Sequence, residues 1–284
     1  MILLIAAIFV FVLIYVCFKL LDRFGVDNSV SILWNYWVAS MTGFLVFGVD
    51  FNLLIQSSWL WIAILVGVIF FGVFHLFAIC SQKISITMTA MSSKMSVVIP
   101  VVASLIIFKE ELSIVKLIGI VVTLISLFLI LKPDRAKPID KKYLIVPILI
   151  FVFTGISDTM IKVAQTGHGI EDAFDSARFV SSIFGISFLV ALFASPFQKV
   201  KANVYFQRKN LIGGFVLGLI NFFAVFLFTY SMINYDGSYF FPIFNSGVVA
   251  GSALIGYLFF KERLSKINLL GLLVATLAII LMNL

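Results

Sequence analysis

The segment Phe108-Lys-Glu-Glu-Leu-Ser-Ile-Val-Lys-Leu-Ile-Gly119 recurs later in the chain as Phe260-Lys-Glu-Arg-Leu-Ser-Lys-Ile-Asn-Leu-Leu-Gly271. Phe, Lys, Glu, Leu, Ser, Leu and Gly stand at the same places in both copies, at a constant offset of 152 residues. A shorter match joins Ile8-Phe-Val-Phe11 to Ile150-Phe-Val-Phe153, near the start of each half. Recurrence of this kind indicates two copies of one structural unit.

The composition excludes an ordinary soluble protein. Of the 284 residues, 62% are hydrophobic and only 12% are charged, whereas a soluble domain has about 45–50% apolar and about 25% charged residues. A transmembrane helix needs about 20 mostly apolar residues to cross the bilayer. The chain therefore has room for about ten such helices and no separate soluble domain. We predict an all-α membrane protein.

Ten apolar segments have the length of a spanning helix, and the polar stretch 132–142 separates five from five. We predict a first repeat over 1–131 and a second over 143–284, joined by this linker. Because five is odd, the copies enter the membrane from opposite sides, which is the inverted-topology repeat of many secondary transporters. The predicted spans are Ile2–Leu20, Val30–Val49, Trp59–Cys80, Ile84–Ile107, Ile114–Leu131, Tyr143–Ala164, Ala173–Ala194, Leu211–Ile233, Ser238–Phe260 and Ile267–Leu284.

The basic residues indicate the orientation in the membrane. The net charge of +7 would suggest nucleic acid as the partner of a soluble protein, but here the charges lie in short loops, where Lys and Arg mark the cytoplasmic side. We expect no nucleic-acid partner and a bacterial-type inner membrane, with both termini outside. We interpret the first apolar segment as a retained helix, since it lacks the basic start and cleavage site of a signal peptide. The side predicted to face outward carries only Lys109, Lys116, Lys162 and Arg178.

The repeated motif resembles that of a known family. Lys109-Glu-Glu-Leu-Ser113 and Lys261-Glu-Arg-Leu-Ser265 each end the fourth span of a half, and Pro100 stands nine residues before the first copy. The chain is similar throughout to the drug/metabolite transporter superfamily, in its ten-helix EamA-type branch, although Ser252 replaces the proline in the second half. The resemblance implies a carrier of amino acids, drugs, sugars or other metabolites. It also implies termini in the cytoplasm, opposite to the charge count.

The motif also has a physical explanation as a tight turn at the membrane surface. Ser113 and Ser265 can each cap the following helix by accepting a hydrogen bond from an unpaired N–H group. Glu110 and Glu262 can pair with a neighbouring basic residue. We therefore interpret the motif as a structural turn.

Lys94 is the most informative single residue for function. It lies about ten residues into the fourth span, and at about 1.5 Å per residue it is about 15 Å deep. A Lys at the bilayer centre costs roughly 2.5–3.5 kcal/mol on insertion scales. Ser93, Ser96 and Pro100 share one helical face, and Pro100 frees a backbone carbonyl near Ser96. We predict that Lys94 faces a cavity and binds a carboxylate or phosphate. The alternative is a structural ion pair with a buried acid.

The second repeat supplies polar counterparts to this region. Aligned at the offset of 152 residues, Asn245 falls opposite Ser93 and Ser246 falls opposite Lys94. A cavity lined by both spans would be charged on one wall and neutral on the other. That arrangement suits a substrate with one acidic group and an uncharged remainder.

Two further residues are candidates for proton coupling. Asp158 lies well inside the sixth span, four residues before Lys162. It can carry protons or bind a substrate amine, or it can form a helical ion pair with Lys162. His75 lies in the third span among phenylalanines. It is the second candidate, and its alternative role is a hydrogen-bonded packing residue.

Other polar residues inside the spans are weaker candidates. Asn35, Tyr36 and Asn221 can line a cavity or simply bond a neighbouring helix. We expect the 32 phenylalanines to face lipid or fill the core, not to form an aromatic substrate cage. Small residues spaced four apart favour close helix approach. They are Gly214 and Gly218, and Gly247 and Gly251.

The motifs of other function classes do not occur. There is no Gly-x-x-x-x-Gly-Lys-Ser/Thr for ATP, no His-Glu-x-x-His for zinc and no Gly-x-Ser-x-Gly nucleophile elbow. Cys17 and Cys80 form no disulfide framework or metal spacing.

We expect no enzyme, cofactor or metal site, and predict a secondary active transporter of a small organic metabolite such as an amino acid or organic anion. It would act as an exporter by alternating access, with a midplane site between the repeats. The sequence leaves open a homodimer, and the alternatives are a channel, a structural membrane protein or an intramembrane enzyme.

Overall fold

The computed structural model describes residues 1–48, 51–83, 86–110, 113–131, 141–198, 200–260 and 265–282. Within these ranges the chain is all-α, as predicted. It divides into two compact units, unit 1 (Met1–Phe71 with Val163–Ile233) and unit 2 (Gly72–Lys162 with Asn234–Leu284). Each unit therefore combines helices from both halves of the sequence. The predicted boundaries of the repeats stay a prediction, and most of the predicted linker lies outside the described residues.

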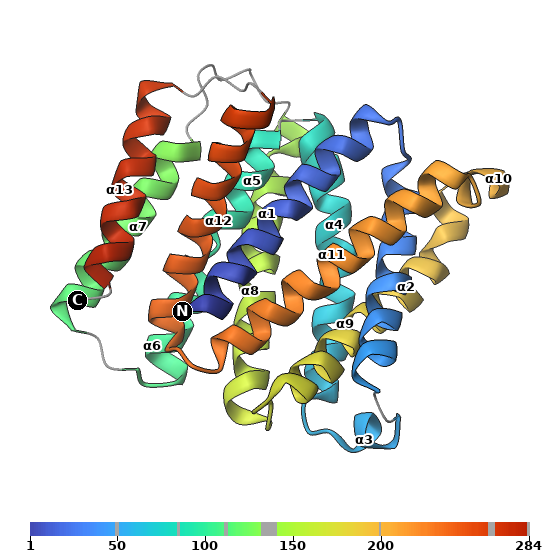
Figure 1. Cartoon of the computed structure of the whole chain (residues 1–284), viewed down its shortest axis with the longest axis horizontal. Helices are drawn as coiled ribbons and strands as arrows, with labels where there is room; N and C mark the ends of the chain where they lie inside the picture. The colour runs from blue at the N-terminus through green and yellow to red at the C-terminus, as the bar shows by residue number, and fades with distance from the viewer. Residues whose placement is uncertain are drawn as a thin grey trace. The chain divides into compact units, whose positions relative to one another are not determined.

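Unit 1 is built around α11, which packs against α1, α2 and α9 (Figure 1). Helix α2 also packs directly on α9. The first part of α4 and the last turn of α8 belong to this unit. Its elements are α1 (Ile2–Arg23), α2 (Asn28–Phe47), α3 (Phe51–Gln56), α4 (Leu60–Lys83), α9 (Ala173–Ala194), the 3-10 turn η2 (Ser195–Gln198), α10 (Ala202–Tyr205) and α11 (Arg208–Met232).

Side-chain caps set the ends of two helices in unit 1. The Asp27 carboxylate accepts a hydrogen bond of 3.1 Å from the Val30 N–H at the start of α2. Gly48 follows the same helix with a φ of 60°, a left-handed conformation that glycine adopts without strain. Asp172 caps α9 in the same way, accepting from the Asp175 N–H at 2.8 Å. Both acidic caps satisfy N–H groups that a helix start leaves unpaired.

The predicted close approach at Gly214 and Gly218 is confirmed. A Cβ atom added at Gly214 would lie 2.4 Å from the Cβ of Trp34, and one added at Gly218 would lie 2.8 Å from the backbone oxygen of Asn35. Real Cβ atoms do not make contacts this short, so α11 meets α2 backbone to backbone. We call this contact the glycine seam.

Unit 2 contains the remaining helices and the rest of α4 and α8. Helices α7 and α13 lie side by side (Figure 1), and α12 packs on α6, α7 and α13. Helix α5 packs on α7. The elements are α5 (Ile86–Met95), α6 (Val98–Ile107), α7 (Ile114–Leu131), the 3-10 turn η1 (Lys141–Tyr143), α8 (Ile145–Gly167), α12 (Gly237–Phe260) and α13 (Lys266–Met282).

The predicted fourth span is two helices with a break between them. Helix α5 ends at Met95 and α6 begins at Val98. Pro100 has no N–H to donate to the carbonyl of Ser96, four residues earlier. That carbonyl accepts instead from the Ile99 N–H at 2.9 Å, and the Ser96 hydroxyl donates to the Ser93 carbonyl at 2.5 Å. These bonds stabilise a non-helical turn at the break.

The repeated motif forms helix-capping turns. In the second copy, the Asn268 N–H donates to the Ser265 hydroxyl at 3.2 Å and the Ser265 N–H donates to the Asn268 side chain at 2.9 Å. The predicted capping role of Ser265 is therefore confirmed. Glu110 of the first copy accepts the Gly237 and Ser238 N–H groups, at 2.7 and 2.9 Å. Its carboxylate thus caps α12, which is distant in sequence. Glu262 lies outside the described residues.

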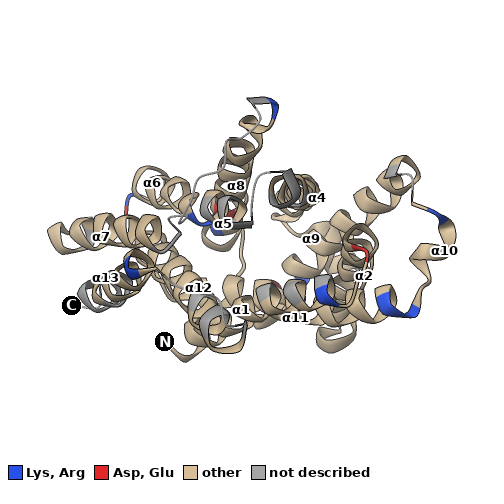
Figure 2. Cartoon of the chain, turned by 90° about the horizontal axis from the view of Figure 1, so that it is seen from above, with Lys and Arg blue, Asp and Glu red and all other residues tan. Residues whose placement is uncertain are grey.

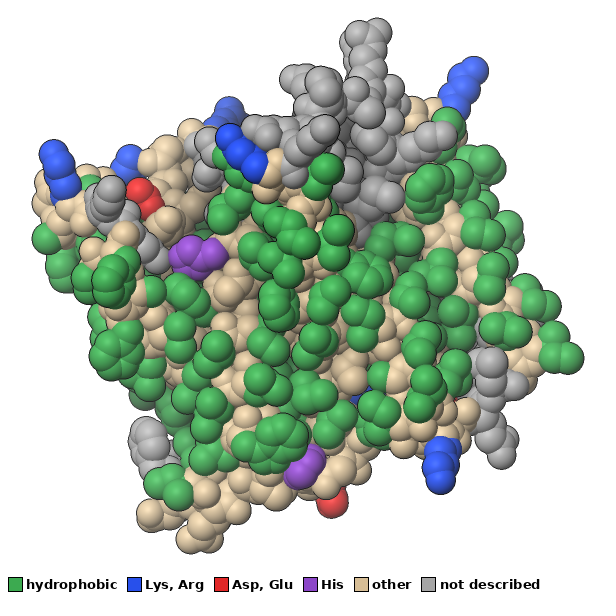
Figure 3. Space-filling model, turned by 180° about the vertical axis from the view of Figure 1, so that it is seen from behind, with side chains coloured by type: hydrophobic (Ala, Val, Ile, Leu, Met, Phe, Trp, Pro, Cys, Tyr) green, Lys and Arg blue, Asp and Glu red, His purple; other side chains and the backbone are tan. Residues whose placement is uncertain are grey.

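Each predicted span corresponds to one helix, except the fourth, which corresponds to α5 and α6, and the bounds of α7 and α9 agree with the prediction. Side chains visible in Figure 3 are mostly hydrophobic, and Figure 2 places most of the coloured charges at helix ends and in loops. This is the surface of a membrane protein. In the described ranges, five helical stretches are long and apolar enough to cross a bilayer: Asn28–Phe47, Leu60–Phe77, Ile145–Gly167, Ala173–Phe197 and Arg208–Met232.

Candidate functional site

Lys94 lies one residue before the end of α5, at the break that precedes α6. Only 8% of its surface is exposed. Ser93 and Ser96 on either side of it are also buried, and so is Pro100 in the first turn of α6. A broken helix at membrane depth normally lines a cavity or is enclosed by protein, because its backbone groups cannot be left facing lipid. A buried ammonium at such a break is a strong candidate for ligand binding.

Two groups that interact with Lys94 come from α8 and α12 of the same unit. Its Nζ atom lies 5.9 Å from the centroid of the Phe244 ring on α12, within the range of a cation–π interaction. Its positive charge also interacts electrostatically with the half-buried carboxylate of Asp158 on α8. The structure thus brings together Lys94 and Asp158, which the sequence suggested for separate roles.

A glycine on α8 lets this helix pass close to the break. A Cβ atom added at Gly155 would lie 2.5 Å from the Cδ1 atom and 2.7 Å from the Cβ atom of Ile99 on α6. Asp158 follows Gly155 by about one helical turn, and Ile99 stands just after the break. The missing side chain therefore allows the α8 backbone to approach the segment that carries Lys94.

Helix α12 adds neutral polar groups to the same unit. The Asn245 amide donates to the Phe241 carbonyl at 3.0 Å, within its own helix. The hydroxyl of Ser246 is buried and has no hydrogen-bond partner among the described residues. The hydroxyls of Thr154 and Ser157 on α8 are likewise buried and unpaired within the described ranges. Buried hydroxyls without partners are costly, and they are groups that a polar ligand can satisfy.

Lys162, at the far end of α8, belongs to a different set of contacts. Its Nζ atom donates to the Tyr235 carbonyl at 3.0 Å, and its charge interacts with Glu110 and Asp236. These contacts hold together the end of α6, the start of α12 and α8. The helical pairing between Asp158 and Lys162 that the sequence allowed stays an alternative.

The remaining predicted site residues divide between the two units. In unit 1 the Asn221 amide donates to the Asn35 side chain at 3.1 Å, and the Tyr36 hydroxyl donates to the Phe70 carbonyl at 3.3 Å. These bonds join neighbouring helices, which is the alternative role considered for them. His75 is half-buried on the part of α4 that belongs to unit 2.

The sequence did not indicate Phe244, Thr154 or Ser157. Phe244 is one of many phenylalanines, and only its neighbour Asn245 marks its position on α12. Ser157 directly precedes Asp158, so a search for hydroxyls flanking the buried acid would have found it. No three His, Cys, Asp or Glu side chains of the described residues lie close enough together to hold a metal ion.

Comparisons with known proteins place this chain among transporters. Residues 141–284 match the family model described as the EamA-like transporter family. An uncharacterized protein of Haemophilus influenzae is 29% identical over 287 residues, which cover 97% of this chain and 95% of the relative. A protein of known crystal structure superposes on 100% of this chain and 97% of its own length, with a TM-score of 0.77 and 11% identity. That structural similarity shows a common fold.

Proposed function

We propose that this chain, which belongs to the EamA-like transporter family, is a secondary active transporter of small organic metabolites that carry an acidic group, such as amino acids or organic anions. Lys94 would bind the acidic group. Ser93, Ser96, Asn245 and Ser246 would contact the uncharged remainder. The protein would have no enzymatic activity and no cofactor.

The observation that carries the proposal is the setting of Lys94. Its ammonium is almost fully buried at a helix break, where it interacts with the carboxylate of Asp158 and the ring of Phe244. A buried positive charge favours binding of an opposite charge, because electrostatic interactions are stronger in a medium of low dielectric constant. The hydroxyl of Ser246, which has no partner among the described residues, would offer a hydrogen bond to the same ligand.

The interaction with Asp158 suggests how binding would be coupled to protons. While Asp158 is ionised, it competes with the substrate carboxylate for Lys94. Protonation of Asp158 would remove this competition and allow the anion to bind. Release of the proton on the other side of the membrane would restore the interaction with Lys94 and expel the substrate. Proton and anion would thus cross in the same direction, and export would be driven by an outward gradient of the metabolite. His75, also in unit 2, is the second candidate for a proton carrier.

The wider cycle follows from the predicted organisation. We propose ten spanning helices in two inverted repeats, working by alternating access around a midplane site to which both repeats contribute. Helices α5 and α6 come from the first predicted repeat, whereas α8 and α12 come from the second. The charge bias supports an inner-membrane orientation with both termini outside. Export is the direction that we propose. A homodimer is compatible with this scheme.

Counterflow uptake into proteoliposomes tests the substrate class. The panel contains amino acids, organic acids, sugars and cationic drugs, and the variants are Lys94→Met and Lys94→Arg. We expect compounds with a carboxylate to be carried, and Lys94→Met to weaken their binding by about 10–150-fold, the value of one hydrogen bond to a charged group. Lys94→Arg should retain part of the activity. Lys266→Met, at the exposed start of α13, is the matched control and should behave like the wild type.

A double variant separates binding from a purely structural ion pair. In Lys94→Met/Asp158→Asn both charges are gone, so neither is left buried without its partner. If Lys94 binds substrate, the double variant folds but does not carry carboxylates. Normal transport by the double variant, or transport of neutral and cationic compounds alone, would refute the proposed site. A transport rate that does not depend on pH between about 5 and 8 would refute the coupling through Asp158.

A further inference from the structure

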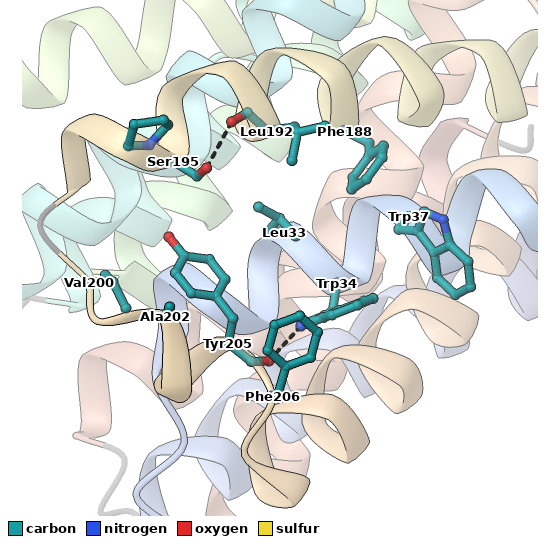
Figure 4. Close-up of a pocket in the computed structure, with 11 residues that line it drawn as sticks. Leu33, Trp34, Trp37, Phe188, Leu192, Ser195, Val200, Ala202, Tyr205 and Phe206 are labelled. Carbon is teal, nitrogen blue, oxygen red and sulfur yellow. Dashed lines mark hydrogen bonds between the residues drawn. The ribbon is translucent and has the colours of Figure 1, made fainter.

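Unit 1 contains a pocket of about 530 Å³ beside its short helix α10. Its walls come from the first half of α2, the end of α9 with η2, and the segment around α10 (Figure 4). A volume of about 300–1,000 Å³ is typical of sites for small ligands. The lining residues are Leu33, Trp34, Trp37, Phe188, Leu192, Ser195, Pro196, Val200, Ala202, Tyr205 and Phe206.

The lining is apolar except at one point. The Trp34 indole N–H donates to the Tyr205 carbonyl at 2.9 Å, and the Ser195 hydroxyl donates to the Leu192 carbonyl at 2.8 Å. Both polar groups are thus occupied. The Tyr205 hydroxyl is buried and has no partner among the described residues. In Figure 4 its ring extends from α10 toward Ser195. The pocket therefore offers one hydrogen-bonding group to an otherwise apolar ligand.

The segments beside the pocket carry basic residues. Lys201 stands between the lining residues Val200 and Ala202, and Arg208 begins α11 two residues after the lining residue Phe206. Both basic side chains are exposed. Figure 2 shows the basic positions on either side of α10. Phe197 is 85% exposed, which fits contact with lipid and not with water. Tryptophan, tyrosine and basic side chains together are typical of the membrane–water interface.

We propose that this pocket binds an anionic phospholipid, with one acyl chain in the apolar space and the phosphate against Lys201 and Arg208. The Tyr205 hydroxyl would donate to an oxygen of the glycerol ester or the phosphate. Each basic residue near an anionic headgroup strengthens such binding. The charge beside the pocket selects an anionic headgroup over a zwitterionic one. The pocket itself has no charged lining residue, so it does not suit the carboxylate of a small hydrophilic metabolite.

Native mass spectrometry of the full-length protein in detergent tests the assignment. Phosphatidylglycerol and phosphatidylcholine with identical acyl chains are titrated separately. We expect phosphatidylglycerol to bind the wild type at least tenfold more tightly. Lys201→Gln/Arg208→Gln should reduce this preference by about tenfold or more, whereas Lys266→Gln, an exposed basic residue of unit 2, should leave it unchanged. Tyr205→Phe should weaken binding by about tenfold, the value of one hydrogen bond.

A second variant blocks the acyl site directly. Ala202→Trp places a large side chain in the pocket and should remove binding of both lipids, whereas Phe193→Trp, on an exposed α9 residue outside the lining, should not. Glycerol phosphate, which carries the headgroup without acyl chains, should not compete. Equal binding of the two lipids, retained binding in Ala202→Trp, or displacement by glycerol phosphate would each overturn the proposal. None of these outcomes depends on the transport activity.

Discussion

The cap that Glu110 places on α12 gives a prediction whose magnitude can be worked out. Its carboxylate accepts hydrogen bonds from two backbone N–H groups, those of Gly237 and Ser238, and both residues are buried. Glu110→Ala leaves both N–H groups without this acceptor. A buried group left unpaired costs about 1–3 kcal/mol, so the variant should lose about 2–6 kcal/mol of stability. Glu110→Gln can still accept one of the bonds and should lose about half as much.

Cysteine accessibility is a suitable assay for this prediction. Cys17 in unit 1 and Cys80 in unit 2 are both free and buried, so a thiol-reactive fluorescent dye reports when each becomes exposed on heating. In a Cys17→Ser background the signal comes from Cys80 and therefore from the unit that contains Glu110. A loss of this size should lower the melting temperature by several degrees.

The control is Glu171→Ala, which removes an exposed acid from the loop before α9. It should leave the melting temperature unchanged. If Glu110→Ala melts within about one degree of the wild type, the two hydrogen bonds do not stabilise α12 and the reasoning is wrong.

Three further changes can be measured with the same dye assay. Gly155→Ala should destabilise unit 2 by about 1–3 kcal/mol, because the new methyl group overlaps Ile99, whereas Gly72→Ala, where an added Cβ meets nothing within 4 Å, should not destabilise it. Asp27→Ala removes the cap of α2 and should cost about 0.5–2 kcal/mol, with most of the loss restored in Asp27→Asn. Ser265→Ala should destabilise α13 by a similar amount, and unchanged melting would show that its capping bonds contribute nothing.

Local patterns in the sequence predicted the helices well. Apolar runs of the right length predicted helices that the structure contains, and the predicted bounds of α7 and α9 agree with those of the structure. The cap at Ser265 followed from the spacing of hydroxyl and helix start. The short helices α3 and α10 were not predicted, because four to six residues carry too weak a periodic signal. The break before α6 follows from Pro100, but its extent depends on which hydrogen bonds replace the missing one.

The candidate site was predictable only in part. The positions of Lys94 and Asp158 inside apolar segments can be recognised from the sequence alone. The interaction between their side chains cannot, because it depends on the close approach of α8 to the helix break, which Gly155 allows. The hydrogen bond between Glu110 and Gly237 could not be predicted either, because 127 residues separate the two in the sequence. Tertiary contacts of this kind have no local signature.

The glycine seam between α2 and α11 has a consequence for how the protein can vary. Where two backbones touch, adding a side chain at the contact separates the helices. A second mutation to a smaller neighbouring side chain cannot restore the contact, because the neighbouring atoms include those of the backbone. A deep mutational scan should therefore show Gly214 and Gly218 as intolerant even of alanine, while lipid-facing positions on the same helix accept many apolar residues. For directed evolution, the seam is the part of unit 1 to leave fixed. New substrate preferences would have to arise from side chains elsewhere.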